Sequence, residues 1–356
     1  MLLSKIWKGF STMATNEKNS KLALKIGTHS GAFHCDEALA CFMLKQLPQY
    51  HDADIIRTRD TKILDTCDIV VDVGAVYDPK RHRYDHHQKG FKHTLSSVRP
   101  DIAKNKTIKL SSAGLIYAHF GVDVIKEILS TQKYQYMPEE LERIYLAVYD
   151  GFIEEIDAID NGIPMYADGT PRYRIDTHLS ARVHMLNPEW NETNSPNIDE
   201  VFQSAMKLVG GEFSARVIRI GTVWFPARSI VKKAIENRKH VHESGQIIEL
   251  TERCPWKQHL LDLEEEINIQ NEIKFAIFHE SLYDSWRVQG IPIQPESFIC
   301  RVFLHKDWHG VRNEELSNVS GISDCVFCHA SGFIGENKTR AGALEMALKS
   351  LQAHEN

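Results

Sequence analysis

Histidine and aspartate residues gather in four clusters in the first half of the chain, each at the end of an apolar run. Carboxylate and imidazole side chains are the groups that bind divalent metals and move protons in hydrolytic sites. A fold brings such groups together from distant positions where strands end and helices begin. The pattern therefore predicts a two-metal centre suited to phosphoester hydrolysis. The clusters are His29, His34 and Asp36; Asp72; Asp85, His86 and His87; and Asp150.

The first cluster lies where a strand is expected to turn into a helix. Residues 22–26 form a short apolar segment, and residues 36–47 have the apolar spacing of an amphipathic helix. His29, His34 and Asp36 are then within reach of one another across the turn. A second interpretation is that His34 and Asp36 only begin and cap the helix, since aspartate favours helix N-termini.

The next two clusters follow short apolar or extended segments. Asp72 comes directly after residues 69–71, which are typical of a buried parallel strand. A carboxylate buried there is costly unless it is paired or binds a metal, and a surface strand end is the alternative. His86 and His87 are adjacent, and neighbouring side chains of an extended segment point to opposite sides. One of them can bind a metal while the other faces a substrate.

The order of the four clusters resembles that of the DHH phosphoesterase superfamily. This superfamily includes RecJ-type exonucleases, oligoribonucleases and manganese pyrophosphatases. Within it, several runs of the chain are similar to the MYG (melanocyte proliferating gene) exonuclease family, and the similarity extends over nearly everything after about Lys21. The runs are residues 27–38, 85–91, 154–162, 179–183 and 329–335.

The resemblance implies a role for each cluster residue. His29 and His34 would bind one metal, Asp72 would bridge, and the second metal would be bound by Asp36, His86 and Asp150. It also implies that His87 and Asp85 are the catalytic residues, with His87 facing the scissile phosphate.

Two features of the motifs leave open which metal binds and which residue is the fourth-motif ligand. The wider superfamily usually has aspartate where this chain has His34, and an imidazole there shifts the preference toward softer transition metals. We therefore expect two divalent ions, Mn²⁺ first, with Mg²⁺ or Zn²⁺ as alternatives. Asp150, Glu154 and Asp157 recur on one expected helix face, so Asp157 competes with Asp150 for the fourth-motif ligand.

The charge of the chain limits how it can hold a nucleic acid. A net charge of -6 excludes a generally basic nucleic-acid coat, so any grip on RNA must be local. Between Asp78 and Lys109, nine basic residues stand against three acidic ones, around the Asp-His-His motif. This run is either a funnel for a phosphate backbone or an ordinary solvated loop.

A second candidate substrate element lies near the C-terminus. Residues 325–335 are expected to form a short apolar strand and a glycine-bearing turn, followed by a helix from Arg340 to Leu351. Backbone N–H groups of such a turn can hold a phosphate or sugar, and the segment resembles the substrate-closing element of DHH nucleases; an ordinary strand-to-helix connection is the alternative. The residues expected to bind substrate are Arg81, Lys89, Arg182, His329, Ser331, Gly332, Lys338 and Arg340.

The cysteines do not indicate a cofactor. Cys325 and Cys328, followed by His329, match the pattern of c-type haem attachment, but they lie inside an apolar segment and no second Cys-x-x-Cys completes a zinc site. We interpret them as buried packing residues. Seven cysteines without framework spacing indicate a reducing compartment rather than secretion.

The positions of the expected elements predict an α/β fold in two lobes. Residues 21–190 would form a DHH-like catalytic domain with a parallel sheet and helices on both faces. Residues 191–245 would form a helical bridge, and residues 246–356 a smaller α+β domain that binds substrate. The strands expected in this last domain are residues 247–250, 274–278, 286–288 and 298–302.

Residues 1–20 are expected to be a leader or a disordered tail. Their first twelve residues are basic, Ser/Thr-bearing and free of acidic residues, as mitochondrial leaders are, and Met13 offers a second start. We expect a mitochondrial and a nucleocytoplasmic product, and no apolar stretch reaches membrane-spanning length.

The resemblance implies a metal-dependent 3'-to-5' exonuclease acting on single-stranded RNA in RNA processing. The alternatives are a small-molecule phosphoesterase acting on pyrophosphate or dinucleotides, and a non-catalytic regulator that binds metal and RNA. The sequence leaves the oligomeric state open.

Overall fold

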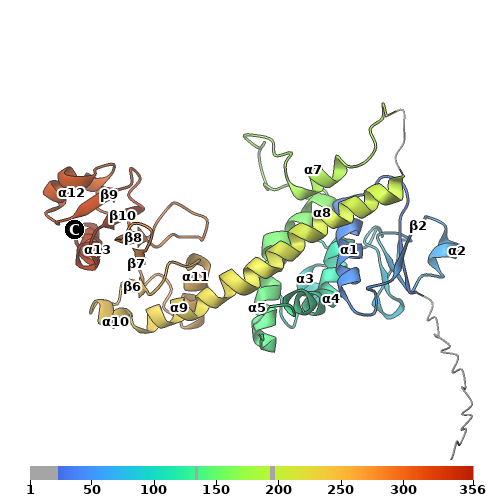
Figure 1. Cartoon of the computed structure of the whole chain (residues 1–356), viewed down its shortest axis with the longest axis horizontal. Helices are drawn as coiled ribbons and strands as arrows, with labels where there is room; N and C mark the ends of the chain where they lie inside the picture. Colours follow the sequence, from blue (N-terminus) through green and yellow to red (C-terminus); the bar gives the residue numbers. More distant parts are fainter. Residues whose placement is uncertain (1–22, 133–134, 193–196, 356) are drawn as a thin grey trace, which may run out of the picture. The chain divides into compact units, whose positions relative to one another are not determined.

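The computed structural model describes residues 23–132, 135–192 and 197–355 of the 356-residue chain. It divides into two compact units (Figure 1). The first comprises Met1–Glu127 and Ile153–Gly211, and the second comprises Ile128–Phe152 and Glu212–Asn356. The boundaries therefore differ from the expected ones, because residues 128–152 group with the C-terminal part. The expected leader lies outside the described residues.

The first unit contains a five-stranded, mostly parallel sheet, as the sequence predicted. Its strand order is β2-β1-β3-β5-β4, and only the edge strand β4 runs antiparallel to its neighbour. Each strand is short, which leaves the residues after β1, β3 and β5 at one edge of the sheet. The strands are β1 (Lys25–Thr28), β2 (Asp54–Arg57), β3 (Ile69–Val71), β4 (Tyr77–Asp78) and β5 (Arg83–Tyr84).

Helices cover both faces of this sheet. Gly27 and Val70 face Leu64 and Cys67 at the end of α2, where an added Cβ on Gly27 would lie only 3.0 Å from the Cys67 sulfur. The alternate residues Ile69 and Val71 are buried on the opposite face, where α1 contacts β3. The helical elements are α1 (Cys35–Gln46), α2 (Thr61–Leu64), η1 (Pro79–Arg81), α3 (Leu95–Val98), α4 (Ser112–Leu129), α6 (Glu154–Asp160) and α7 (Leu179–His184).

The helix before the fourth motif is not regular. α5 (Pro138–Val148) continues through a π-helical turn, η2 (Tyr149–Ile153), into α6. A π turn holds extra residues and rotates the helix after it relative to the helix before it. The helix face that carries Asp150 therefore does not continue in simple register along α6.

The chain continues through the helices expected between the lobes, the first of which crosses the boundary between the units at residues 211–212, into a second five-stranded sheet. The helices are α8 (Ile198–Arg219), η3 (Ile220–Trp224), α9 (Phe225–Glu236), α10 (Arg238–Val241), α11 (Lys257–Glu266), η4 (Lys306–Trp308), α12 (Asn313–Ser320) and α13 (Arg340–Glu355). The strands are β6 (Ile247–Leu250), β7 (Phe275–Glu280), β8 (Ser285–Gly290), β9 (Cys325–Cys328) and β10 (Ile334–Asn337), in the order β6-β7-β8-β10-β9.

The predictions for this sheet are correct for four strands and wrong in two places. Only β6 and β7 are parallel, so the sheet is mixed as expected. The predicted strand at residues 298–302 is wrong, since its only ladder contact is an isolated bridge between Pro292 and Cys300. Residues 325–328 form β9 and a helix begins at Arg340, as expected, but residues 334–337 form β10, a strand that the sequence analysis did not predict. Cys325 and Cys328 are buried in the core of this unit.

No helix of the described residues is long and apolar enough to cross a membrane.

Candidate metal centre

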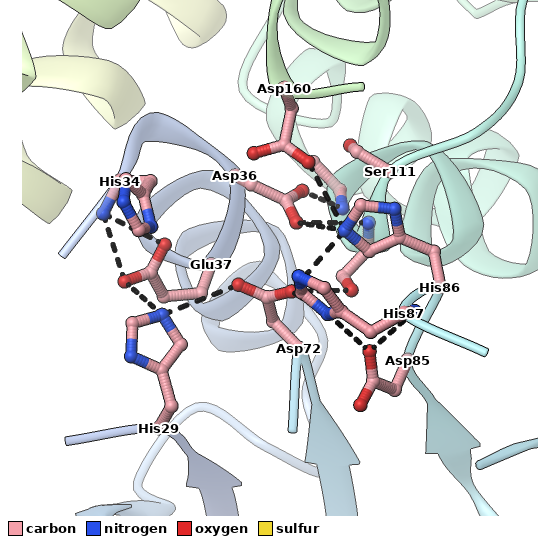
Figure 2. Close-up of polar contacts among 12 residues, drawn as sticks. His29, His34, Asp36, Glu37, Asp72, Asp85, His86, His87, Ser111 and Asp160 are labelled. Atoms are coloured by element: carbon pink, nitrogen blue, oxygen red, sulfur yellow. Dashed lines mark hydrogen bonds and ion pairs between the residues drawn. The ribbon is translucent and has the colours of Figure 1, made fainter. Parts of the chain in front are cut away.

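The first three His and Asp clusters converge at one edge of the first sheet (Figure 2). His29 follows β1, Asp72 follows β3, and the Asp-His-His triplet follows β5, which are three parallel strands. Parallel strands end at the same edge of a sheet, which is where open α/β folds place their sites. Asp72 adopts φ of 58°, a left-handed conformation that a non-glycine residue rarely takes outside constrained sites.

Four residues form the first group of potential ligands. His29, His34, Glu37 and Asp72 each offer one atom, and these atoms lie within 4.8 Å of one another. The Nε2 atom of His29 is 2.9 Å from Glu37 Oε1 and 3.4 Å from Asp72 Oδ2. Burial alone would lower the pKa of His29, but the carboxylates of Asp72 and Glu37 outweigh it and raise this pKa to about 10.

A second group is built around His86. Its buried Nε2 atom lies 3.1 Å from Asp160 Oδ2, 3.5 Å from Asp72 Oδ1 and 3.7 Å from Asp36 Oδ2. Asp36, His86 and Asp160 satisfy the spacing of a metal site, and Asp72 faces both groups. Burial alone would lower the pKa of His86, but the surrounding carboxylates outweigh it and raise this pKa to about 11.

The hydrogen bonds around Asn161 fix the orientation of the His86 ring. The Asn161 amide nitrogen donates to the carbonyls of Lys109 (2.9 Å) and Asp157 (2.8 Å), so its oxygen must accept. This oxygen lies 3.2 Å from His86 Nδ1, which therefore carries a hydrogen. In the neutral ring Nε2 is then a bare lone pair. It is buried, and it makes no hydrogen bond of good geometry with any residue that the structure describes.

The donor set therefore fits a cation. A lone pair aimed at three carboxylates is repelled by them unless a proton or a cation lies between. Repulsion is also seen at Asp36, whose pKa is raised by burial and by the charges of Asp160 and Asp72. The pKa of Asp72 is lowered, because His29 and His86 outweigh the effect of its burial. Neutral imidazoles and carboxylates are suitable ligands for Mn²⁺, Zn²⁺ or Mg²⁺.

The N-terminus of α4 holds two of these carboxylates in place. The backbone N–H groups of Ser112 (3.0 Å) and Ala113 donate to Asp36, and the Ser112 hydroxyl donates to Asp72 Oδ1 at 3.2 Å. The partial positive charge of a helix N-terminus also favours the ionised carboxylate. The sequence analysis did not identify this support, because a Ser-Ser pair before a helix is an ordinary start signal.

Of the acidic residues in and after the fourth motif, the structure places Asp160, rather than Asp150 or Asp157, beside His86. Asp150 is exposed and is in neither group, and the buried Asp157 instead accepts from the N–H (2.9 Å) and hydroxyl (2.8 Å) of Ser111. Asp160, one turn after Asp157, is the carboxylate that approaches His86. The predicted i, i+4, i+7 face assumed a regular helix, whereas the π turn at Tyr149–Ile153 changes the helical phase.

His87 is placed differently from His86. Its side chain is 61% exposed and lines a cleft over the cluster, whereas Asp85 is buried. His87 Nδ1 lies 2.7 Å from Asp85 Oδ1, and Asp85 also accepts the N–H groups of His87 (3.0 Å) and Ala75 (2.6 Å). Asp85 thus holds the Nδ1–H tautomer of His87 and leaves its other ring nitrogen for a group in the cleft. Asp85 is a positioning residue.

The cleft has a volume of about 990 Å³, and its lining includes Arg59, Arg174 and His178, which the sequence analysis missed. Arg174 forms an ion pair with Asp176, which also lines the cleft, at 2.6 Å. Arg59 also contacts the first group, with Nη2 3.3 Å from His29 Nδ1. Of the expected substrate residues, Arg81 and Lys89 are exposed outside this lining, and Arg182 is also outside it, where its Nε donates to the Thr177 carbonyl at 3.1 Å.

The expected substrate residues of the second unit are largely engaged with one another. Gly332 has φ of 69°, and its N–H donates to the His329 carbonyl at 2.8 Å. The Ser331 N–H donates to His329 Nδ1 at 3.1 Å, so these two N–H groups are satisfied within the turn. Arg340 pairs with Glu249 at 2.9 Å. The side chains of His329 and Lys338 are exposed.

Comparison with known proteins agrees with the motifs. The model of the MYG1_exonuc family, described as "Uncharacterised protein family (UPF0160)", matches residues 25–351. The "MYG1 exonuclease" of Homo sapiens is 49% identical over 328 residues, which is 92% of this chain and 85% of that protein. "MYG1 protein C27H6.8" of Caenorhabditis elegans is 48% identical over 93% of this chain and 96% of its own length.

The similarity extends to fungi. "MYG1 protein YER156C" of Saccharomyces cerevisiae is 42% identical over 340 residues, which is 94% of this chain and 97% of that protein. No solved structure matches the chain. The matched region covers both sheets and every residue of the two ligand groups. The resemblance drawn from the motifs is thus confirmed, and the chain belongs to the MYG1 exonuclease family.

Proposed function

We propose that this chain is a metal-dependent exonuclease that shortens single-stranded RNA from its 3' end. The observation that carries the proposal is the buried Nε2 of His86, which makes no hydrogen bond of good geometry with the described residues and faces the carboxylates of Asp36, Asp72 and Asp160. The name of the human relative, MYG1 exonuclease, supports an exonuclease activity. The choice of RNA and the 3'-to-5' polarity rest on the family resemblance.

Two groups of residues would hold the metals. His29, His34 and Asp72 would hold one cation, and Asp36, Asp72, His86 and Asp160 the other. We expect the two divalent cations to be Mn²⁺. When bound, they would supply the Lewis acidity that activates water and neutralises phosphoryl charge. The role of the protein is to keep Asp72 at the centre of both groups. Ser112 does this by donating to Asp72 Oδ1.

His87 is suited to proton transfer at the leaving group. Its Nδ1–H is held by Asp85, so Nε2 is the nitrogen that exchanges a proton with a substrate in the cleft. When Nε2 is protonated, the imidazolium donates to the departing 3' oxygen, and the buried Asp85 carboxylate stabilises its charge. Proton transfer of this kind contributes a factor of about 10² to 10⁴ in rate.

The substrate grip that we propose is local. Arg59, Arg174 and His178 line the cleft and would contact phosphates next to the scissile bond. The basic residues between positions 80 and 109, which include Arg81 and Lys89, would attract the strand electrostatically. In addition, we assign Arg182, His329, Ser331, Gly332, Lys338 and Arg340 to RNA binding on the strength of the resemblance.

The test is digestion of a 5'-labelled single-stranded RNA by the purified protein in Mn²⁺. A variant with Asp85, His86 and His87 replaced by alanine removes the catalytic pair and one ligand, and Asp150→Ala serves as the control. We expect a ladder that shortens from the 3' end with wild type and the control, and none with the triple variant. Phosphate release from pyrophosphate alone would replace the proposal by a small-molecule phosphoesterase. Bound metal without turnover would replace it by a regulatory protein.

For the location, we propose a mitochondrial product from Met1 and a nucleocytoplasmic product from Met13. N-terminal sequencing of the protein from fractionated cells should give both ends. A single end in a single compartment would contradict this.

A further inference from the structure

The first ligand group contains a carboxylate that the DHH resemblance does not assign. We propose that Glu37 is a direct ligand of the first metal and replaces the negative charge that the chain lacks at His34. The inference rests on the metal centre proposed above. It concerns a residue one position after the motif ligand Asp36, on the first turn of α1.

The geometry around Glu37 is that of one coordination sphere. Its Oε1 lies 2.9 Å from His29 Nε2, and the same nitrogen lies 3.4 Å from Asp72 Oδ2. Ligand atoms about 2.1 Å from one cation lie about 3.0 Å apart at adjacent octahedral positions and about 3.4 Å apart at tetrahedral ones. His34 completes a group whose atoms all lie within 4.8 Å (Figure 2).

Charge balance also requires another carboxylate. Without Glu37, the ligands of both groups supply three carboxylates, Asp36, Asp72 and Asp160, against two divalent cations. With Glu37 the set contains four, which neutralise the two cations when the imidazoles are neutral. The first group alone then has two carboxylates and two imidazoles. Because buried charge is costly unless it is compensated, the balanced set is the stable one.

Helix capping does not account for Glu37 by itself. Both of its carboxylate oxygens lie 3.0 Å from the backbone nitrogen of His34, which is the ordinary capping-box contact. A capping glutamate has no need to be buried, and Glu140 makes the same contact to Met137 at 2.8 Å while partly exposed. Glu37 is fully buried, and a carboxylate has lone pairs for both a capping N–H and a cation.

A carboxylate ligand has a measurable consequence for metal choice. Oxygen donors favour Mn²⁺ and Mg²⁺, whereas a site of imidazoles with a single carboxylate favours Zn²⁺. Glu37→Gln keeps the shape and the capping oxygen but removes the charge and weakens the ligand. Loss of a helix cap alone would lower stability without changing the ratio of Mn²⁺ to Zn²⁺ affinity.

The experiment is calorimetric and EPR titration of the metal-free wild type, Glu37→Gln and Glu140→Gln with Mn²⁺, and in parallel with Zn²⁺. Wild type and Glu140→Gln should each bind two Mn²⁺ ions. In Glu37→Gln, one Mn²⁺ site should weaken at least tenfold, and Zn²⁺ affinity at that site should fall less.

The possible outcomes separate the two proposals. Two unweakened Mn²⁺ sites in Glu37→Gln would overturn the role of Glu37 and leave the metal centre standing, whereas a wild type that binds neither metal would overturn both. If Glu37→Gln does not fold, crystals of wild type soaked in Mn²⁺ decide, since an Oε atom of Glu37 should lie about 2.0 to 2.2 Å from an anomalous peak. A longer separation, with no bond, would refute the inference.

Discussion

Replacing Asp85 by asparagine tests the proton-transfer role of His87 with a minimal change of shape. The two oxygens of Asp85 accept from three donors, namely the Nδ1–H and N–H of His87 and the N–H of Ala75, at 2.7, 3.0 and 2.6 Å. An asparagine must turn its NH₂ group toward at least one of these donors. A buried donor left without a partner costs about 1–3 kcal/mol, so the free energy of unfolding should fall by about that amount.

The effect on catalysis should exceed the effect on stability. If the NH₂ group faces the ring, His87 changes to the Nε2–H tautomer and loses the lone pair that exchanges a proton in the cleft. We expect kcat to fall by a factor of about 10² to 10⁴, the usual contribution of general acid–base catalysis. KM and the bound metal should change little, because Asp85 is in neither ligand group.

The assay is release of the 3'-terminal nucleotide from a single-stranded RNA in Mn²⁺ by wild type, Asp85→Asn, His87→Ala and the double variant. Asp85 acts through His87, so the double variant should be no slower than His87→Ala alone. Asp78→Asn is the control, since among the described residues the Asp78 side chain accepts only the Lys80 N–H in η1. A kcat of Asp85→Asn within threefold of wild type, or losses that multiply in the double variant, would refute the reasoning.

Three further results are expected. Asp160→Ala should lose most of its bound metal and activity while Asp150→Ala keeps both, as measured by metal analysis and RNA digestion; the reverse would restore Asp150 as the ligand. In the metal-free protein the pKa values of His29 and His86 are raised from 6.5 to about 10 and 11. The stabilisation from their protonation is therefore complete below pH 6.5 and is lost as the pH rises through 10 to 11. The melting temperature of the EDTA-treated protein should fall across this range, and a flat profile would contradict it. Gly114→Ala would place a Cβ against the buried carboxylate of Asp157 and should lower the free energy of unfolding by about 1–3 kcal/mol in chemical denaturation. Gly211→Ala is the control, because an added Cβ there would have no neighbour within 4 Å.

The sequence was sufficient for the ligands that follow strands. His29 and Asp72 could be placed because a short apolar run predicts a strand, and the residue after a parallel strand lies at the site edge. His86 and His87 could be given different roles because neighbours on an extended segment point apart. In the structure, His86 is buried beside three carboxylates and His87 is largely exposed.

The residues that escaped prediction depend on helix phase and on tertiary contacts. Asp160 lies beyond a π turn, and no residue pattern in 149–153 predicts the extra residue in that turn. Glu37 at the third position of a helix indicates a capping box, and only its burial beside His29 indicates a second role. Arg59 and Arg174 line the cleft from segments far apart in the sequence.

Tertiary packing also explains why the strand predicted at residues 298–302 of the second unit was wrong. Residues 298–302 have the apolar character of a strand, but Phe298 and Ile299 are exposed, and the sheet is completed by β10 beside β8. The residues after Cys328 form a turn that returns the chain antiparallel, so its backbone N–H groups bond within the turn. Strand propensity alone does not choose between partners, because pairing is decided by packing in the whole sheet.

Backbone N–H groups, as well as side chains, bind the buried carboxylates of the candidate metal centre. Asp36 is bound by two N–H groups at the start of α4, and Asp85 by the N–H groups of Ala75 and His87. Backbone donors cost no side-chain entropy and orient the carboxylates. The His86 ring is in turn fixed by Asn161, which is anchored to two carbonyls. These groups are thus oriented by the fold, and the charges of Asp72 and Asp160 repel the carboxylate of Asp36, whose pKa is raised.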